Sequence, residues 1–536
     1  MQIVADKQGF SVRAFQEQWF YCPVVSAVDA DGKSDWDDPY VPVLSFAQEQ
    51  GADGARYIWR THSNLWEKKE YVLEVTPHAA RYFVRVEGRG RVDAIRFFCG
   101  QAQYEAAGYM LPLANHADYN RNLRMSTEAG AIELGYFTPP CYCYPFYMAD
   151  CDGWLGVGLA AREGQYNFDR FLYCNENAGT CGFALPLNGQ TAVDGTWESQ
   201  SLLFVEGKDA YAVIRAYAAW HYESGWCRRA DRSQMPQWWK RPIFCGWGEQ
   251  NALQKRSGAA RPGDFATQRD YERMSARLDE LDLHPGCIII DDKWQRYYGE
   301  ALPDWEKWPD MRQFTDQEHA KGRRVVLWFR SWYPEGLSQE ECVEYLCTAC
   351  AADPTSEAYR ARIQKTLRTL LSDEPGCCNC DGFKIDFANC MPLGKYVSCH
   401  EPGVYGVELL KRFFLLLYRC AKQVKPDALI NCSCAHPYFD EVTDQCRMHD
   451  YWGTMRNAPE VFAHRTKLAT AALPGVLVDM DAGGTGSRRD FRRWIRAQGK
   501  MGIPDLYYLS ASEGVPFDAE DVAFIRQAWQ EYERTL

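Results

Sequence analysis

The sequence lacks a long apolar run and lacks an excess of positive charge. No stretch of the 536 residues is long and apolar enough to cross a bilayer, so we expect no membrane partner. The net charge of −12 argues against nucleic acid and anionic membrane surfaces, since both attract basic proteins. The first residues, Met-Gln-Ile-Val-Ala-Asp-Lys, have no basic start and no apolar segment. We therefore expect no signal peptide and a cytoplasmic location.

Disulfides are a further expected absence, although the chain has 22 cysteines. Several of them lie inside apolar, strand-like runs, such as Cys287 before three isoleucines and Cys432 after Leu-Ile-Asn. Reduced thiols fit this placement better than a disulfide framework. One cluster nevertheless has a spacing that a structural zinc site could use. It comprises Cys347, Cys350, Cys377, Cys378 and Cys380.

A zinc site in this cluster competes with a simpler interpretation, which we favour. Cys347 and Cys350 would lie on a helix, and the other three would line the turn before a strand. No histidine accompanies the cluster, and thiols are abundant throughout the chain. Any zinc here would be structural, so we expect no catalytic metal and no cofactor.

Aromatic and apolar residues are plentiful. The length predicts two to four domains, and a hydrophobic fraction of 46% is enough for sizeable cores. The chain has 19 tryptophans and 31 tyrosines. Sugars stack their C–H faces on such rings, so the composition favours a carbohydrate ligand, although protein cores use the same residues.

The hydrophobic pattern divides the chain into three parts. Residues 1–207 contain short alternating runs separated by polar or Gly/Pro turns, which predicts an antiparallel β-sandwich. Residues 208–239 form a predicted helical linker, helical to about residue 222 and then rich in charge. Residues 240–536 form the predicted catalytic domain.

The third part alternates apolar strands with amphipathic segments such as residues 357–371. Strands that are apolar throughout indicate a parallel sheet covered on both faces, and eight of them predict a (β/α)8 TIM barrel. The fifth and sixth strands are only a loop apart, so we expect one helix to be missing there. The predicted strands are residues 243–247, 287–290, 325–329, 382–385, 428–431, 445–448, 476–478 and 506–509.

Polar residues follow most of these strands, at the end where barrel enzymes carry their active sites. A single aspartate after a strand most often caps the next helix, but so many polar strand ends indicate a shared site. Two of the carboxylates, Asp386 and Asp450, are of the kind that glycoside hydrolysis needs. One carboxylate attacks the anomeric carbon and the other protonates the leaving oxygen.

The barrel part, roughly residues 240–515, resembles the clan of retaining α-galactosidases and raffinose-synthase-like enzymes, glycoside hydrolase family 36 and its relatives. The motifs that carry the resemblance occur in the family's order. Two departures bear on which sugar fits, namely Lys293 in place of a glycine and Cys-Ala-His-Pro after Ser433 in place of a glycine-rich turn. The motifs are Asp291-Asp-Lys-Trp294, Asp304-Trp305, Lys307-Trp-Pro309, Trp328-Phe-Arg330, Lys384-Ile-Asp386 and Asn431-Cys-Ser433.

The resemblance implies a role for each of these positions. Asp386 would be the ionised nucleophile, favoured by Lys384, and Asp450 the acid/base, whose pKa burial must raise, with Trp452 a candidate for that burial. Asp291 and Asp292 would bind hydroxyls far from the cleaved bond, and Arg447 those near the anomeric centre. The other expected substrate-binding residues are Trp247, Trp294, Trp305, Trp328, Arg330, Cys432 and His449.

The expected function is that of a retaining, exo-acting α-glycosidase, most similar to an α-galactosidase, acting on an oligosaccharide or glycoside. A raffinose-synthase-like transglycosylase would use the same carboxylates. Lys293 and His436 could also admit an amino, N-acetyl or anionic sugar. The glycine-rich residues 483–489, which end in Arg488 and Arg489, are either a solvated rim loop or an anion site. A catalytically inactive sugar-binding protein and a homo-oligomer are further alternatives.

Overall fold

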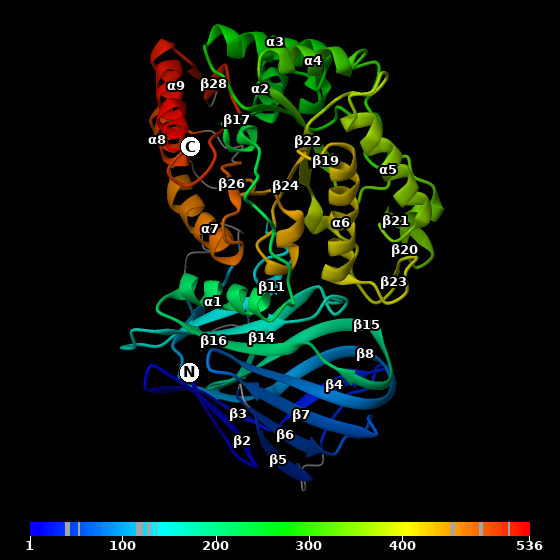
Figure 1. The fold of residues 1–536 in the computed structure, drawn as a ribbon, viewed down its shortest axis with the longest axis vertical. Coiled ribbons are helices and arrows are strands. Elements are labelled where there is room, and N and C mark those ends of the chain that lie inside the picture. Colours follow the sequence, from blue (N-terminus) through cyan, green and yellow to red (C-terminus); the bar gives the residue numbers. More distant parts are fainter. Residues whose placement is uncertain are drawn as a thin grey trace.

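The computed structural model contains a β-rich N-terminal part and a barrel, which lie at opposite ends of the long axis in Figure 1. It describes residues 1–37, 43–51, 54–113, 122–125, 130–135, 137–451, 456–481, 486–512 and 515–536. Within these ranges no helix is both long and apolar enough to cross a bilayer.

The N-terminal part is a 16-stranded sheet whose strands pair antiparallel, as the alternating sequence predicts. Its inward side chains are largely aromatic, including Trp19, Trp59, Tyr82 and Phe97, which are buried. The strands are β1 (Gln2–Ala5), β2 (Gly9–Ala14), β3 (Glu17–Pro23), β4 (Ser26–Ala30), β5 (Ser45–Gln50), β6 (Ala55–Thr61), β7 (Lys68–Val75), β8 (Ala80–Tyr104), β9 (Gly108–Met110), β10 (Asn122–Arg124), β11 (Gly130–Glu133), β12 (Cys143–Tyr147), β13 (Trp154–Ala160), β14 (Arg170–Asn177), β15 (Thr180–Glu198) and β16 (Ser201–Gly207).

Strand pairing is continuous through this sheet, and the sandwich arrangement of its layers stays a prediction. The long strand β8 connects the parts, because it pairs with β3, β4, β7, β15 and β16. The ladder between β8 and β15 shifts register twice, between Cys181 and Phe183 and between Pro186 and Thr191. Such bulges bend a strand, which lets one long hairpin pass from one layer to the next.

The barrel prediction is confirmed by eight parallel strands, one in each predicted place. Their order is β26-β25-β24-β22-β19-β18-β17-β27, and a parallel bridge between Asp479 and Ile503 nearly closes the sheet. The strands are apolar on both faces because one faces the barrel interior and the other the surrounding helices. They are β17 (Ile243–Cys245), β18 (Cys287–Ile290), β19 (Arg324–Arg330), β22 (Gly382–Asp386), β24 (Leu429–Cys432), β25 (Gln445–Arg447), β26 (Leu477–Asp479) and β27 (Asp505–Leu506).

Helices surround the barrel, and the expected gap between the fifth and sixth strands is present. Only the short 3-10 helix η5 (Pro437–Val442) separates β24 from β25. The amphipathic segment predicted at 357–371 is α5, capped by the Ser356 side chain. The α-helices are α1 (Ala210–Glu223), α2 (Trp247–Ser257), α3 (Gln268–Glu280), α4 (Met311–Ala320), α5 (Glu357–Leu371), α6 (Gly406–Val424), α7 (Ala458–Ala472), α8 (Arg488–Gln498) and α9 (Ala519–Glu533).

A three-stranded sheet is inserted beside the barrel, formed by β20 (Cys342–Tyr345), β21 (Thr348–Ala352) and β23 (Val397–Ser398). The prediction that Cys347 and Cys350 lie on a helix is therefore wrong. Cys347 is in the β20–β21 turn, in the left-handed region at φ 63°, and Cys350 is on β21.

The zinc alternative is not supported either. The insertion follows the carboxyl end of β19, whereas the cysteines at 377–380 precede the amino end of β22, so the two groups belong to opposite ends of the barrel. In the part of the chain that the structure describes, no group of three or more Cys, His, Asp or Glu side chains is arranged to hold a metal.

The segment between β11 and β12 of the N-terminal part contacts the chain just after barrel strand β24. The amide of Thr138 donates to the carbonyl of Ser433 (2.5 Å), and that of Ala435 donates to the carbonyl of Pro139 (2.9 Å). Ser433 and Ala435 directly follow β24, so the first part of the chain lies beside one side of the barrel rim.

Candidate active site

Asp386 is the last residue of β22, and four groups contact its carboxylate. The Arg447 guanidinium lies 2.9 Å from Oδ1 and the His449 Nε2 lies 3.3 Å from it. The Trp328 indole donates to Oδ2 (3.2 Å), and the backbone N–H of Phe387 donates to Oδ1 (2.8 Å). A carboxylate held by this many donors is fixed in position and favoured in its ionised form.

The ionisation of Asp386 depends chiefly on Arg447. Burial alone would raise the pKa of Asp386, but the charges of Arg447 and Lys384 and the hydrogen bond from His449 outweigh it and hold the pKa well below its ordinary value. Arg447 is 1% exposed and is itself held by Asp481 through its Nε and Nη2 atoms, both at 2.5 Å. Asp481 therefore fixes the guanidinium that fixes Asp386.

Lys384 lies below this pair, inside the barrel. Its ammonium contacts the carboxylates of Asp291 (3.1 Å) and Asp481 (3.3 Å) and the hydroxyl of Tyr507 (3.0 Å). It is 3% exposed, and all its donors are used within the protein. The ammonium contributes to the low pKa of Asp386, as predicted, but its burial leaves no surface for the predicted contact with a sugar hydroxyl.

Asp450 follows β25 on the same rim and differs from Asp386 in its charge environment. Burial and the charges of Asp481 and Asp386 raise the pKa of Asp450, against the opposing effect of His449 and Arg447. No basic side chain forms an ion pair with it among the described contacts. The two carboxyl groups therefore have pKa values displaced in opposite directions, the arrangement that separates a general acid from a nucleophile.

His449 connects these two carboxyl residues. Its Nδ1 accepts a hydrogen bond from the backbone N–H of Asp450 (2.8 Å), while its Nε2 faces Asp386. The residue is in the left-handed region at φ 61°, which is costly for a side chain with a Cβ. Arg465 compensates by donating to the carbonyls of Met448, His449 and Asp450. His449 was predicted to bind substrate, and the structure places it between the two candidate catalytic residues.

Asp291 and Asp292 at the end of β18 have different surroundings. Asp291 is 3% exposed, and its oxygens are occupied by Lys384, the Cys245 thiol (3.1 Å) and the N–H of Asp292 (2.9 Å). Asp292 is half-buried and accepts a hydrogen bond from the Tyr298 hydroxyl (2.7 Å), and burial raises its pKa. Of the two carboxylates predicted to meet the sugar, only that of Asp292 has an exposed surface.

The departure at Lys293 has a visible cost. Lys293 is left-handed at φ 73°, a conformation that glycine adopts freely, which explains why the similar family has glycine there. Its ammonium lies 4.0 Å from the centre of the Tyr298 ring and 3.3 Å from the Glu335 carboxylate. These contacts hold the Lys293 ammonium at the rim of the site, where a glycine would place no side chain.

Two further residues that were predicted to bind substrate have no exposed surface. Trp294 and Cys432 are both 0% exposed. The Trp294 indole donates to the carbonyl of Trp328 (2.8 Å), and the Cys432 thiol packs against Cys434 and Thr443. Both side chains therefore belong to the core.

The remaining predicted residues are spread along the rim. The Arg447 side chain has no exposed surface that could contact a sugar. Trp328 is also buried, and its indole N–H donates to the Asp386 carboxylate. Trp247 is partly buried at the start of α2, and Trp305 is 52% exposed after β18. Arg330 ends β19 directly opposite Asp386 in the strand register. Trp452 and residues 482–485 lie outside the described residues.

Three other carboxylates of the barrel part do not fit the role of the acid. Asp481 is ionised, since burial is outweighed by Arg447 and Lys384, which lower its pKa. Asp444 pairs with Lys422 (2.8 Å) at the amino end of β25, away from the rim, and Glu441 pairs with Lys411 (2.8 Å).

At the other end of the glycine-rich segment, Arg488 pairs with Asp518 (2.9 Å) and Asp521 (3.0 Å), which argues against an anion site there.

Sequence reasoning missed the roles of three groups of the site. Tyr298 holds Asp292, Tyr507 holds Lys384, and Asp481 holds Arg447. The position of Asp481 after the seventh strand was a usable signal for the rim, but its partner could be found only from the closed barrel. Tyr298 and Tyr507 carried no signal that distinguishes them from core tyrosines.

Replacing Arg447 with methionine should move the acidic limb of the pH profile of kcat/KM to higher pH. Asp386 must be ionised to attack, and without the guanidinium its pKa rises, so the active form is lost at a higher pH as the solution is acidified. Arg447→Lys, which keeps a charge, should show a smaller shift. An unchanged acidic limb in Arg447→Met would show that Arg447 does not control the ionisation of Asp386.

Comparisons of this chain with known proteins identify structures with a similar fold. No family model and no curated protein matches the sequence. Solved structures do match, among them a GH31 family sulfoquinovosidase from E. rectale in complex with an aza-sugar inhibitor. That match has a TM-score of 0.63 and 10% identity, and it covers 99% of this chain and 83% of that one.

Two further matches are enzymes that form or degrade cycloalternan. The cycloalternan-forming enzyme from Listeria monocytogenes has a TM-score of 0.54 and 11% identity over 99% of this chain, which spans about half (54%) of that enzyme. The cycloalternan-degrading enzyme from Trueperella pyogenes has a TM-score of 0.53 and 11% identity, covering 98% of this chain and 82% of that one. The shared feature is a glycosidase fold, and at this identity the likeness extends to the fold alone.

Proposed function

We propose that this protein is a retaining, exo-acting α-glycosidase in which Asp386 is the nucleophile and Asp450 the acid/base. The observation that supports this most strongly is the pair of rim residues whose carboxyl pKa values are displaced in opposite directions, with His449 in contact with the Asp386 carboxylate and the backbone N–H of Asp450. The glycosidase fold of the similar solved structures agrees with it. Retention requires carboxyl groups roughly 5–5.5 Å apart, so the proposal predicts this separation for Asp386 and Asp450.

In the first step, Asp450 donates its proton to the glycosidic oxygen while the Asp386 carboxylate attacks the anomeric carbon. The bond to the leaving group breaks and a glycosyl ester of Asp386 forms. In the second step, the ionised Asp450 removes a proton from water, which attacks the same carbon and releases Asp386. Two inversions give net retention.

The environment of each residue fits its step. Arg447 and His449 keep Asp386 ionised and aligned, and Arg447 cannot move because Asp481 holds it. Asp450 gains a proton more readily than Asp386 because it lies near two other carboxylates and has no ion-pair partner of its own among the described contacts. The ester carries no negative charge, but the Asp386 carboxylate regains one as it leaves in the second step. The Arg447 guanidinium therefore also assists Asp386 as a leaving group.

An α-galactoside is the first substrate to test, because the barrel motifs are similar to those of α-galactosidases. A panel of nitrophenyl α- and β-glycosides at neutral pH tests the proposal, with α-galactoside, α-glucoside and a sulfonated or carboxylated α-glycoside included. Release of nitrophenol from an α-glycoside and from no β-glycoside is expected. Binding without release from any α-glycoside would favour an inactive sugar-binding protein.

Two refinements have specific support. Arg330 and Lys293 bring two cations to the rim near Asp292, which favours an anionic substituent on the sugar, and one similar structure is of a sulfoquinovosidase. Another similar structure is of a cycloalternan-forming enzyme, which favours a test for transfer. Chromatography of products with and without added sugar acceptor separates a transglycosylase from a hydrolase.

A further inference from the structure

Large aromatic side chains are exposed on only one side of the barrel part. Exposing such rings to water is unfavourable, and rings gathered on one surface mark a binding site. All those that the structure describes as exposed beyond residue 208 follow the carboxyl ends of β18, β19 and β22, three neighbouring strands. They are Tyr297, Trp305, Tyr333, Tyr345, Phe387 and Tyr396.

This set, here called the aromatic rim, begins beside the candidate nucleophile. Phe387 directly follows Asp386, and the Arg330 guanidinium lies 4.5 Å from the centre of the Phe387 ring. The same guanidinium lies 4.3 Å from the Tyr333 ring and 4.8 Å from the Tyr298 ring. Cation–π contacts with three rings hold Arg330 at the end of β19.

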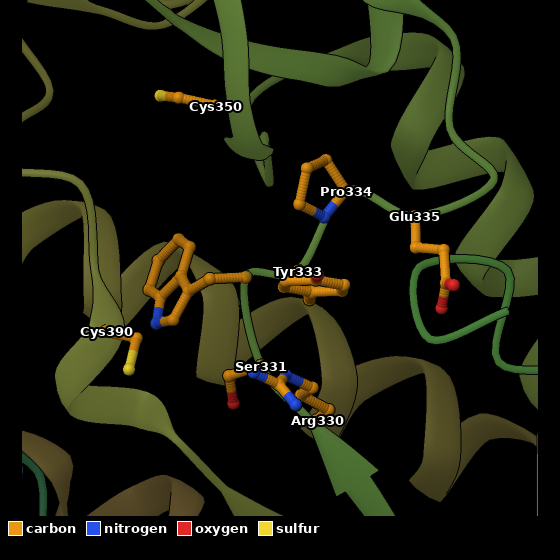
Figure 2. Close-up of a pocket in the computed structure, with 8 residues that line it drawn as sticks. Arg330, Ser331, Tyr333, Pro334, Glu335, Cys350 and Cys390 are labelled. Carbon is orange, nitrogen blue, oxygen red and sulfur yellow. The ribbon is translucent and has the colours of Figure 1, made fainter. Parts of the chain in front are cut away.

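A cavity of about 380 Å³ continues from this point, lined by residues 330–335, Cys350 and Cys390. Figure 2 shows Tyr333 inside this group, between Arg330 at the end of β19 and Pro334. The cavity volume is in the range of sites for small organic ligands. Because Cys350 is on β21, the cavity extends from the catalytic rim to the inserted sheet.

The inserted sheet carries the outer end of the aromatic rim. Tyr345 on β20 is 44% exposed, and Tyr396, which precedes β23, is 57% exposed. Their ring centroids are 6.4 Å apart at nearly a right angle, and the amide of Leu346 donates to the carbonyl of Tyr396. The pair is thus fixed by the sheet pairing while its ring surfaces remain open to solvent.

We infer that the aromatic rim is a set of subsites for the leaving-group side of an oligosaccharide. A sugar chain alternates apolar C–H faces with hydroxyls, which rings, Arg330 and backbone groups can bind together. One sugar unit beyond the cleaved bond would occupy the cavity, and the next would stack on Tyr345 and Tyr396. The substrate class is then a saccharide of three or more units, and a small glycoside would use only part of the site.

This inference rests on the proposed function, so the test uses two substrates with the same sugar at the cleaved end. One is a nitrophenyl α-glycoside, and the other is a series of di-, tri- and tetrasaccharides with that α-linkage. We expect kcat/KM to rise from disaccharide to trisaccharide or tetrasaccharide, by about 10-fold for a ring-stacked unit.

The double variant Tyr345→Ala/Tyr396→Ala should remove this gain and leave the nitrophenyl glycoside unaffected. Tyr345→Phe, which keeps the ring, and Trp36→Ala, which removes a ring 55% exposed on the N-terminal sheet, are the matched controls and should behave like the parent protein. Thermal unfolding of each variant checks that the fold is intact.

Three outcomes would overturn the inference. The first is a kcat/KM that does not depend on chain length, and the second is an equal loss on both substrates in the double variant. The third is a dimer in solution that the double variant dissociates, which would make the rim a contact between copies of the chain. Absence of nitrophenol release in the parent protein would instead contradict the proposed function itself.

Discussion

Asp386→Asn should lower kcat/KM on an activated aryl α-glycoside by on the order of 10⁵-fold, the scale that follows removal of a covalent nucleophile. Asparagine keeps the size of the side chain, and its single amide oxygen can still accept from the Phe387 N–H, so the fold should survive. The chemistry fails because the amide cannot form the glycosyl ester. Steady-state kinetics with a thermal unfolding curve measures both effects.

Asp282→Asn is a suitable control for this variant. Asp282 is an exposed carboxylate that pairs with Arg526 (3.3 Å) near the amino end of β18, at the opposite end of the barrel. It should retain full activity. Comparable activity of Asp386→Asn and the control would remove Asp386 from the mechanism.

Azide added to Asp386→Ala should restore turnover and give a glycosyl azide of inverted configuration, because azide then takes the place of the missing carboxylate.

Asp450→Ala should affect substrates in proportion to their need for protonation. Removal of a general acid costs on the order of 10²–10⁴-fold on a disaccharide, whose leaving alcohol must be protonated. A dinitrophenyl glycoside departs without a proton, so its first step should be nearly unaffected. Azide should accelerate the second step of this variant and give a glycosyl azide of retained configuration.

The parent enzyme should also lose activity on the disaccharide at alkaline pH, as Asp450 ionises. The raised pKa of Asp450 places this loss above the ordinary range of an aspartate, and the alkaline limb should disappear in Asp450→Ala. Equal losses on the disaccharide and the dinitrophenyl glycoside would mean that Asp450 does not donate the proton.

The sequence was sufficient for the eight barrel strands and for the position of the rim carboxylates. Strands buried on both faces read as apolar runs, and the first polar residue after each run marks its carboxyl end, as at Asp386 and Asp291. The motif order then separated Asp386 and Asp450 from the other aspartates. These inferences need only local pattern and the direction of the strands.

Inferences that depend on pairing across the barrel were less successful. Arg447 and Lys384 are charged residues at strand ends, which suggested contact with substrate, but Asp481 and Asp291 occupy them in the interior. Trp294 resembles a stacking residue in sequence and is a core residue in the structure. Cys347 was placed on a helix because the pattern of a short inserted hairpin is too brief to distinguish from a helical turn.

The most direct measurement is the identification of the residue that carries the glycosyl group. A fluorinated glycosyl fluoride of the sugar found in the aryl glycoside panel forms its ester quickly and loses it slowly, which allows mass spectrometry of peptides. The account predicts one added fluoroglycosyl group on the peptide that contains Asp386, and no addition in Asp386→Asn. Labelling of Asp450 or of another residue, or no adduct together with a first product of inverted configuration, would contradict it.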